Sequence, residues 1–146
     1  MTGLRTNLCS AALAAWMAFA GAHTGMAQTS RENIRVFYVP IGMETLKPVT
    51  SENIEKRGRA CLIEATGAIK EIRKILAEAQ PPARPEQRFT NTTVRVKIAE
   101  AQHTAGRQDV IALVEDDGLS RIGDKDYVLS RERLLRLKRL IESSCP

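Results

Sequence analysis

The pattern of hydrophobic and polar positions predicts a β-strand in two parts of the chain. Residues 34–41 are rich in β-branched and aromatic side chains, so we expect a strand that is apolar on both faces over most of its length. Residues 92–101 alternate more cleanly, with hydrophobic side chains on one face and Arg95 and Lys97 on the other. This second pattern is typical of a half-buried antiparallel strand with one face in water.

Further strands are predicted in the last third of the chain. Residues 110–114 are continuously hydrophobic, as in a central strand, and the Asp-Asp-Gly sequence at 116–118 is a hairpin turn signal. The chain then returns along 119–122 and turns again into 126–129. Because the segment 119–122 is short, the alternative is that it forms only an extended hairpin tip.

Hydrophobic residues at steps of three and four predict one long helix, which begins at Thr50 or Ser51 and ends near Ala79. Either hydroxyl can cap the helix, and Glu52 places a negative charge in its first turn, where a helix favours it. Gly67 allows a bend or break, because glycine costs about 1 kcal/mol in a helix interior. The prolines that follow end the helix.

A second helix is predicted over residues 131–144, with Ser130 as its N-cap. Three hydrophobic residues at helical spacing form its apolar face: Leu134, Leu137 and Ile141. Together the elements predict an α+β domain over 34–146, in the order β-α-β-β-β-α. We expect an antiparallel sheet of about four strands with both helices packed on one face. The other face is expected to be partly open and to carry Arg95 and Lys97.

The first 27 residues have the layout of a secretory signal peptide. We expect cleavage after Ala27, or alternatively after Ala22, followed by a polar leader at 28–33. The alternative of an uncleaved membrane anchor is weaker, because the apolar run is shorter than the roughly 20 residues that a helix needs to cross a bilayer. The sequence therefore predicts an exported protein, periplasmic or secreted, with no stable membrane insertion after cleavage.

Removal of this segment changes the composition. The whole chain has 146 residues, a net charge of +5 and 4% aromatic residues. The remaining 119 residues have a net charge of +4, because Arg5 is the only charged residue lost. Four aromatic rings and one histidine, His103, remain. Since single-stranded nucleic acids are bound largely by stacking on aromatic rings, export and this scarcity together argue against a nucleic-acid partner.

Two cysteines, Cys61 and Cys145, remain after cleavage, and an even number in an exported chain predicts one disulfide. Both fall on the predicted apolar faces of the two helices, so we expect the bond to join helix to helix inside the core. A redox pair is the weaker alternative, because the Cys-x-x-Cys spacing that lowers a thiol pKa is missing. Two distant cysteines and one histidine are also a poor ligand set for a metal.

The sequence contains few candidate catalytic residues. His103 lies in a predicted loop, where a lone histidine is usually a solvated surface residue. Acidic residues cluster at 115–117, 124 and 126 around the hairpin turns, but their spacing does not match a calcium-binding loop. Aspartate and glycine are also favoured turn formers. We therefore expect neither an enzyme nor a bound cofactor or metal.

The basic residues are the remaining candidates for function, because electropositive surface attracts acidic partners. The candidate partner-binding residues on the sheet and on the last helix are Arg35, Arg95, Lys97, Arg133, Arg136 and Arg139. We expect a small exported protein that binds a macromolecular partner, for example an inhibitor, an immunity factor or an envelope accessory protein. The alternatives are a structural or assembly component of the cell envelope and, less strongly, an enzyme with a site built from carboxylates and His103. A solvated surface without function is the plain alternative for the basic residues themselves.

Overall fold

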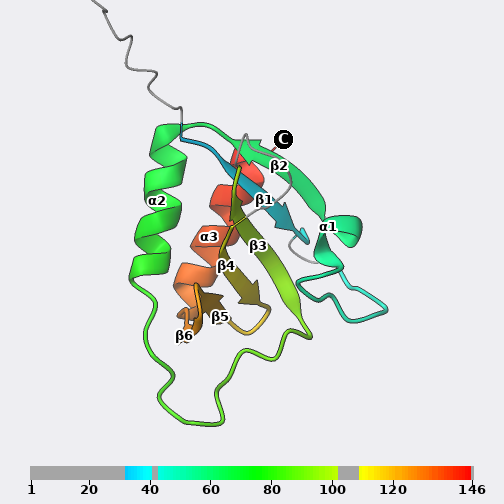
Figure 1. Cartoon of the computed structure of the whole chain (residues 1–146), viewed down its shortest axis with the longest axis vertical. Helices are drawn as coiled ribbons and strands as arrows, with labels where there is room; N and C mark the ends of the chain where they lie inside the picture. Colours follow the sequence, from blue (N-terminus) through cyan, green and yellow to red (C-terminus); the bar gives the residue numbers. More distant parts are fainter. Residues whose placement is uncertain (1–31, 41–42, 102–108, 146) are drawn as a thin grey trace, which may run out of the picture.

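The computed structural model describes residues 32–40, 43–101 and 109–145. Its strands are β1 (Ile34–Tyr38), β2 (Arg59–Ile63), β3 (Val94–Glu100), β4 (Val110–Glu115), β5 (Leu119–Ile122) and β6 (Lys125–Val128). They form one sheet in the order β2-β1-β3-β4-β5-β6, and each neighbouring pair is antiparallel (Figure 1). The predicted α+β class and antiparallel sheet are therefore confirmed, but with six strands rather than about four.

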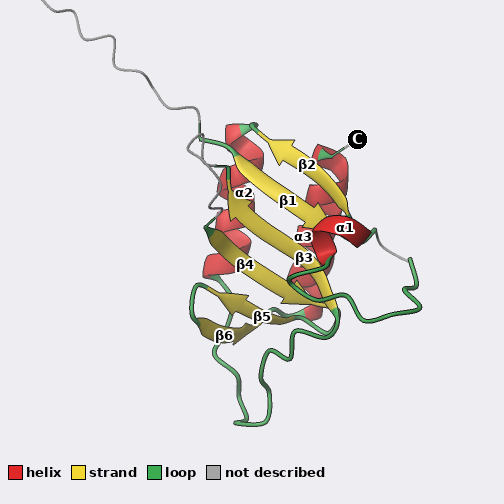
Figure 2. Ribbon diagram, turned by 45° about the vertical axis from the view of Figure 1, so that its right-hand side comes forward, coloured by secondary structure: helices red, strands yellow, loops and turns green. Residues whose placement is uncertain are grey.

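The helices of the described ranges are α1 (Ile54–Arg57), α2 (Thr66–Ala77) and α3 (Arg131–Ser144). Helices α2 and α3 cover one face of the sheet, and α1 lies on the opposite face (Figure 2). The main hydrophobic core fills the space between the sheet and the pair α2 and α3, and its fully buried residues include Val36, Ile72, Ile75, Val96, Ile98, Leu137 and Ile141. A smaller cluster on the α1 face contains Phe37, Val39, Val49, Ile54, Phe89 and Val94.

The predicted helix from residue 50 to Ala79 is wrong in its first half. A short helix, α1, ends at Arg57 with Gly58 as its C-cap. The edge strand β2 follows, and only α2 continues the expected helix. Gly58 permits this change of direction because its backbone packs against β1: a Cβ there would lie 2.7 Å from the carbonyl oxygen of Tyr38. Pairing of β2 with β1, a contact between distant parts of the chain, outweighs the local helical pattern.

The predicted disulfide between Cys61 and Cys145 is present, with a Cα–Cα distance of 5.7 Å. Its predicted setting is wrong, because Cys61 lies on a strand. The bond therefore joins the edge strand β2 to the C-terminal end of α3, on the face of the sheet that the helices cover. Since Cys61 is paired with Val36 in the β1–β2 register, the bond adds a covalent tie at the middle of β2.

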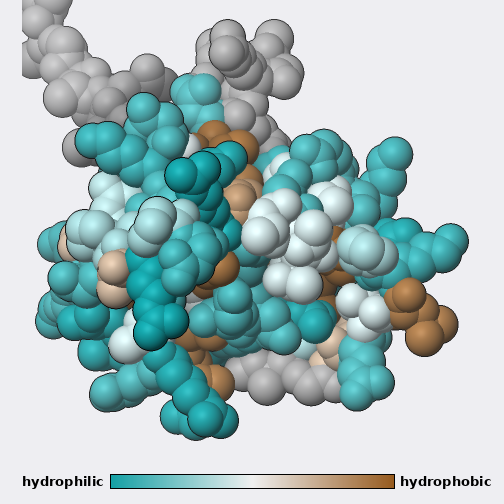
Figure 3. Space-filling view, turned by 90° about the horizontal axis from the view of Figure 1, so that it is seen from below, coloured by the Kyte–Doolittle hydropathy of each residue, from teal (hydrophilic) through white to brown (hydrophobic). Residues whose placement is uncertain are grey.

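The connection from α2 to β3 runs round one end of the molecule and is held by a buried carboxylate. Glu115, at the end of β4, is 1% exposed. Its Oε1 accepts hydrogen bonds from the Thr90 hydroxyl (2.7 Å) and the Thr92 amide (3.1 Å), and its Oε2 accepts one from the Thr90 amide (3.1 Å). Seen from this end, the surface is largely hydrophilic, with hydrophobic groups interspersed (Figure 3). Glu115 thus attaches the end of this long connection to β4.

Candidate functional site

Helix α3 begins and ends as its sequence predicts. The hydroxyl of Ser130 caps it by accepting a hydrogen bond from the Arg133 amide at 3.4 Å. The predicted apolar stripe is buried against the sheet and consists of Leu134, Leu137 and Ile141. Because a helix turns by about 100° per residue, the arginines between these positions point to the sides or to solvent.

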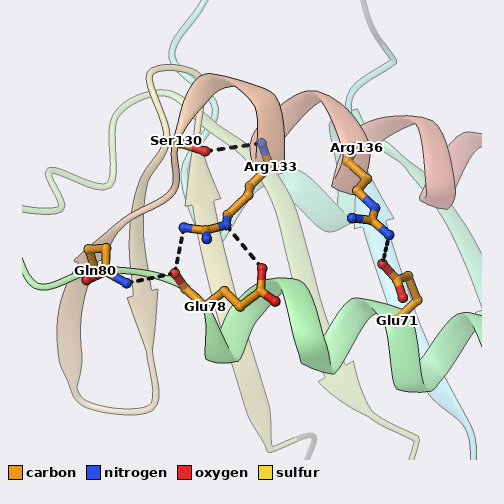
Figure 4. A network of polar contacts seen from close by, with 6 residues as sticks. All are labelled: Glu71, Glu78, Gln80, Ser130, Arg133 and Arg136. Atoms are coloured by element: carbon orange, nitrogen blue, oxygen red, sulfur yellow. Dashed lines mark hydrogen bonds and ion pairs between the residues drawn. The ribbon is translucent and has the colours of Figure 1, made fainter.

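Two of the predicted arginines turn sideways toward α2. Arg133 donates from Nε to Glu78 Oε2 (3.2 Å) and from Nη1 to the Glu78 carbonyl oxygen (2.9 Å). Arg136 forms an ion pair with Glu71 (Figure 4). Both arginines therefore link the two helices, although more than half of the Arg136 side chain stays exposed.

The outward face of α3 forms an open groove of about 900 Å³. Leu135 and Leu140 lie at its two sides, about 140° apart around the helix, and both are only partly exposed. Arg131 and Arg139 lie beside them and are exposed, and among the described residues neither takes part in an ion pair. The residues that line the groove are Arg131, Glu132, Leu135, Arg136, Arg139, Leu140 and Ser143. The sequence interpretation missed Arg131 and both leucines, although a search for partly exposed leucines between arginines on one helix could have found them. We call this surface the α3 groove.

The prediction that Arg95 and Lys97 lie on an open face of the sheet is wrong. Residues 43–57 return across this face, so only 18% of the Arg95 side chain and 12% of the Lys97 side chain are exposed. Arg95 donates to the Met43 carbonyl oxygen at 3.0 Å, and its Nε lies 3.4 Å from an Asp116 oxygen. The structure therefore places Arg95 inside a polar network that attaches the covering segment to the sheet.

Lys97 makes a similar internal connection to α1. Its Nζ donates to Glu55 Oε1 at 2.6 Å and to the Ser51 carbonyl oxygen at 3.3 Å. The Phe37 ring lies 6.0 Å from the same Nζ. Arg35, the remaining candidate on the sheet, is exposed on β1 and neighbours Leu62 of β2. The six predicted basic residues thus do not form one patch.

The acidic residues around the hairpin turns have structural contacts. Asp116 accepts a hydrogen bond from Lys138 at 3.1 Å as well as pairing with Arg95. Asp126 pairs with Arg121 at 2.9 Å and accepts from the Phe89 amide at 3.3 Å. Within the described ranges, no group of three histidine, cysteine or acidic side chains could hold a metal ion. His103, the predicted signal peptide at 1–27 and the leader residues 28–31 lie outside the described residues.

Glu52 is a carboxylate whose pKa departs clearly from its usual value. Hydrogen bonds from the Thr50 side chain, its own backbone amide, and the side chains of Ser51 and Asn91 favour the ionised form. They lower its pKa from 4.5 to about 2. Glu52 is exposed, so this carboxylate organises the turn before α1 rather than a buried site.

This lowered pKa predicts a specific effect of acid. Between pH 4.5 and about 2, Glu52 stays ionised in the folded state and takes up a proton on unfolding. Its contribution to stability is therefore present above pH 4.5 and is lost as the pH falls toward 2. A ¹³C NMR titration of the Glu52 carboxyl should have its midpoint near pH 2, and Glu52→Gln should remove this part of the pH dependence. A midpoint near 4.5 would contradict the hydrogen-bonded arrangement.

Comparison of the chain with protein-family models, with curated proteins and with solved structures finds no match. In the described ranges, none of the helices combines the length and the hydropathy needed to cross a bilayer.

Proposed function

We propose that this is a small exported, non-enzymatic protein that binds an acidic protein partner through the α3 groove. The observation that carries the proposal is the combination of two partly exposed leucines, Leu135 and Leu140, with the exposed cations of Arg131 and Arg139 on one helix face. Desolvated hydrophobic residues supply most of the affinity of a protein interface, whereas charges at its rim steer association and select the partner. A partner that offers both hydrophobic side chains and carboxylates fits this surface.

Two further features support this assignment. The Cys61–Cys145 bond and the ion pairs to α2 hold α3 in place, so little order has to be gained when a partner docks. A disulfide is also typical of proteins that function outside the reducing cytosol, which agrees with the predicted signal peptide. The kinds of protein proposed are inhibitors, immunity factors and envelope accessory subunits.

Charge reversal in the groove tests the proposal. The oxidised chain 28–146 is immobilised, proteins retained from an envelope extract are identified, and the affinity of a purified partner is measured by calorimetry. Arg131→Glu with Arg139→Glu should weaken binding by about tenfold or more, because like charges then meet at the interface. The matched control is Lys47→Glu with Arg84→Glu, which makes the same charge change in exposed connections and should alter affinity by less than about twofold.

Two outcomes contradict the proposal. If both double variants bind the partner as the unmodified protein does, the α3 groove is not the docking surface. If no stoichiometric partner is retained and sedimentation shows concentration-dependent self-association, the protein is an assembly component instead.

A further inference from the structure

The net charge of the protein is concentrated on the two helices that cover the sheet, α2 and α3. Residues 66–78 and 131–144, which are these helices and the C-cap of α2, contain eight basic and four acidic residues. The rest of the chain 28–146 contains thirteen basic and thirteen acidic residues and so has no net charge. The net charge of +4 therefore comes entirely from the helical layer.

The carboxylates that lie between the two helices are already paired. Glu71 of α2 pairs with Arg136 of α3, and Glu78 at the end of α2 pairs with Arg133 (Figure 4). The two pairs neutralise the seam between the helices and fix them antiparallel, because the earlier acidic residue meets the later arginine. These carboxylates are therefore not available to compensate the other cations of the layer.

Two lysines of α2 belong to these uncompensated cations. Lys70 and Lys74 are one turn apart and exposed, on the side of α2 opposite its buried residues. Among the described residues, neither lysine takes part in an ion pair. They match Arg131 and Arg139 of the α3 groove in exposure and in lack of an acidic partner.

The charges on the layer favour a protein over a uniform polyanion. Glu132 is exposed and lines the α3 groove among the arginines. A nucleic acid, an anionic polysaccharide or an anionic lipid surface would place negative charge against this carboxylate, whereas a protein can place a basic group opposite it.

Hydrophobic and aromatic side chains on the layer agree with this choice. Of the described residues, the exposed large hydrophobic ones lie outside α2 and α3, so these helices offer no such side chain for insertion into a bilayer. Neither helix contains an aromatic residue on which a base could stack.

We propose that α2 forms the second half of the docking surface, so that the acidic protein partner spans both helices. Its carboxylates meet Lys70 and Lys74 as well as Arg131 and Arg139, and a basic group meets Glu132. This inference rests on the proposed function, because it concerns the same partner. The ion pairs between α2 and α3 hold the two halves of the surface in fixed positions before the partner binds. The partner is therefore a folded protein with a broad acidic surface rather than a single short peptide.

The probe is the partner purified after retention by the oxidised chain 28–146. Lys70→Glu with Lys74→Glu should weaken its affinity, measured by calorimetry, by about tenfold or more. The matched control is Lys56→Glu with Lys125→Glu, which makes the same change at two exposed lysines outside the helical layer. It should alter the affinity by less than about twofold. Circular dichroism and the melting temperature establish that both double variants are folded.

Cross-linking of the unmodified complex gives a second measurement that needs no variant. A carbodiimide joins a lysine amine directly to a carboxylate that it contacts, and mass spectrometry identifies the joined residues. Lys70 and Lys74 should be joined to acidic residues of the partner, whereas Lys56 and Lys125 should not.

The outcomes separate this inference from the function on which it rests. If reversal at Arg131 and Arg139 weakens binding but reversal at Lys70 and Lys74 does not, or if no cross-link reaches these lysines, the docking surface ends at α3. That result overturns the inference and leaves the proposed function in place. If neither reversal weakens binding, both fail. If no protein partner is retained and the chain binds phosphatidylglycerol vesicles through these cations, both are overturned in favour of a membrane surface.

Discussion

Glu115→Ala is expected to lower the free energy of unfolding by about 3 kcal/mol, because it removes a buried carboxylate that accepts hydrogen bonds from two backbone amides and a hydroxyl. Those amides belong to Thr90 and Thr92, and the Thr90 hydroxyl keeps only its hydrogen bond with the Thr92 hydroxyl. For a domain of this size, such a loss lowers the melting temperature by about 10 °C or more. Urea unfolding followed by circular dichroism measures the change.

The control for this prediction is Glu86→Ala in the same connection. Glu86 is exposed, so its loss should change stability by no more than about 0.5 kcal/mol. Amide exchange adds a local measurement: in Glu115→Ala, residues 89–93 should exchange faster while the amides of β1 change less. If both variants have the stability of the unmodified protein, Glu115 does not anchor the connection.

Replacement of both Cys61 and Cys145 by alanine is expected to cost about 4 to 5 kcal/mol. The two residues are 84 positions apart, and closing a loop of this length removes much of the entropy of the unfolded chain. Since single domains are stable by only about 5 to 15 kcal/mol, the variant should populate unfolded molecules at moderate temperature. Denaturant unfolding of the oxidised protein and of the double variant gives the difference.

Thiol counting provides the independent check. The chain 28–146, denatured without reductant, should contain no free thiol. Two free thiols would show that the bond does not form, and equal stability of the oxidised protein and the double variant would show that it does not stabilise the fold.

The parts of the fold that sequence predicts well are those fixed by local contacts. The last helix follows from the Ser130 cap and the spacing of its leucines, and the hairpin turn follows from Gly118, which has a φ of +92°. The alternation of hydrophobic and polar residues around Val96 likewise indicates a strand with one face in the main core. In each case the residues that determine the element lie within about a dozen positions of one another.

The errors come from contacts between distant segments. No local signal around Cys61 indicates that residues 59–63 pair with β1. The sequence interpretation therefore followed the helical spacing of the surrounding hydrophobic residues and predicted a helix. Similarly, the alternation along the strand predicts that Lys97 faces solvent. In the folded protein Glu55 lies over this face of the sheet and accepts a hydrogen bond from Lys97. The cysteine count predicted the correct pair, because two cysteines allow only one pairing and no geometry is needed to find it. The prediction of which elements the bond joins was wrong, because it placed Cys61 on a helix.

The position of β1 in the sheet has a consequence for how the protein folds. Strands β3 to β6 are joined in sequence order, and the last three are linked by short turns, so this meander can form from local contacts. β1 comes earlier in the chain but inserts between β2 and β3, and it pairs with β3 across an intervening stretch of more than fifty residues. Because pairing across a long loop is entropically costly, it is typical of the slow step in two-state folding. The rate of folding should therefore depend on the pairing of β1 with β3. The meander of β3 to β6 can form earlier, before β1 pairs with it.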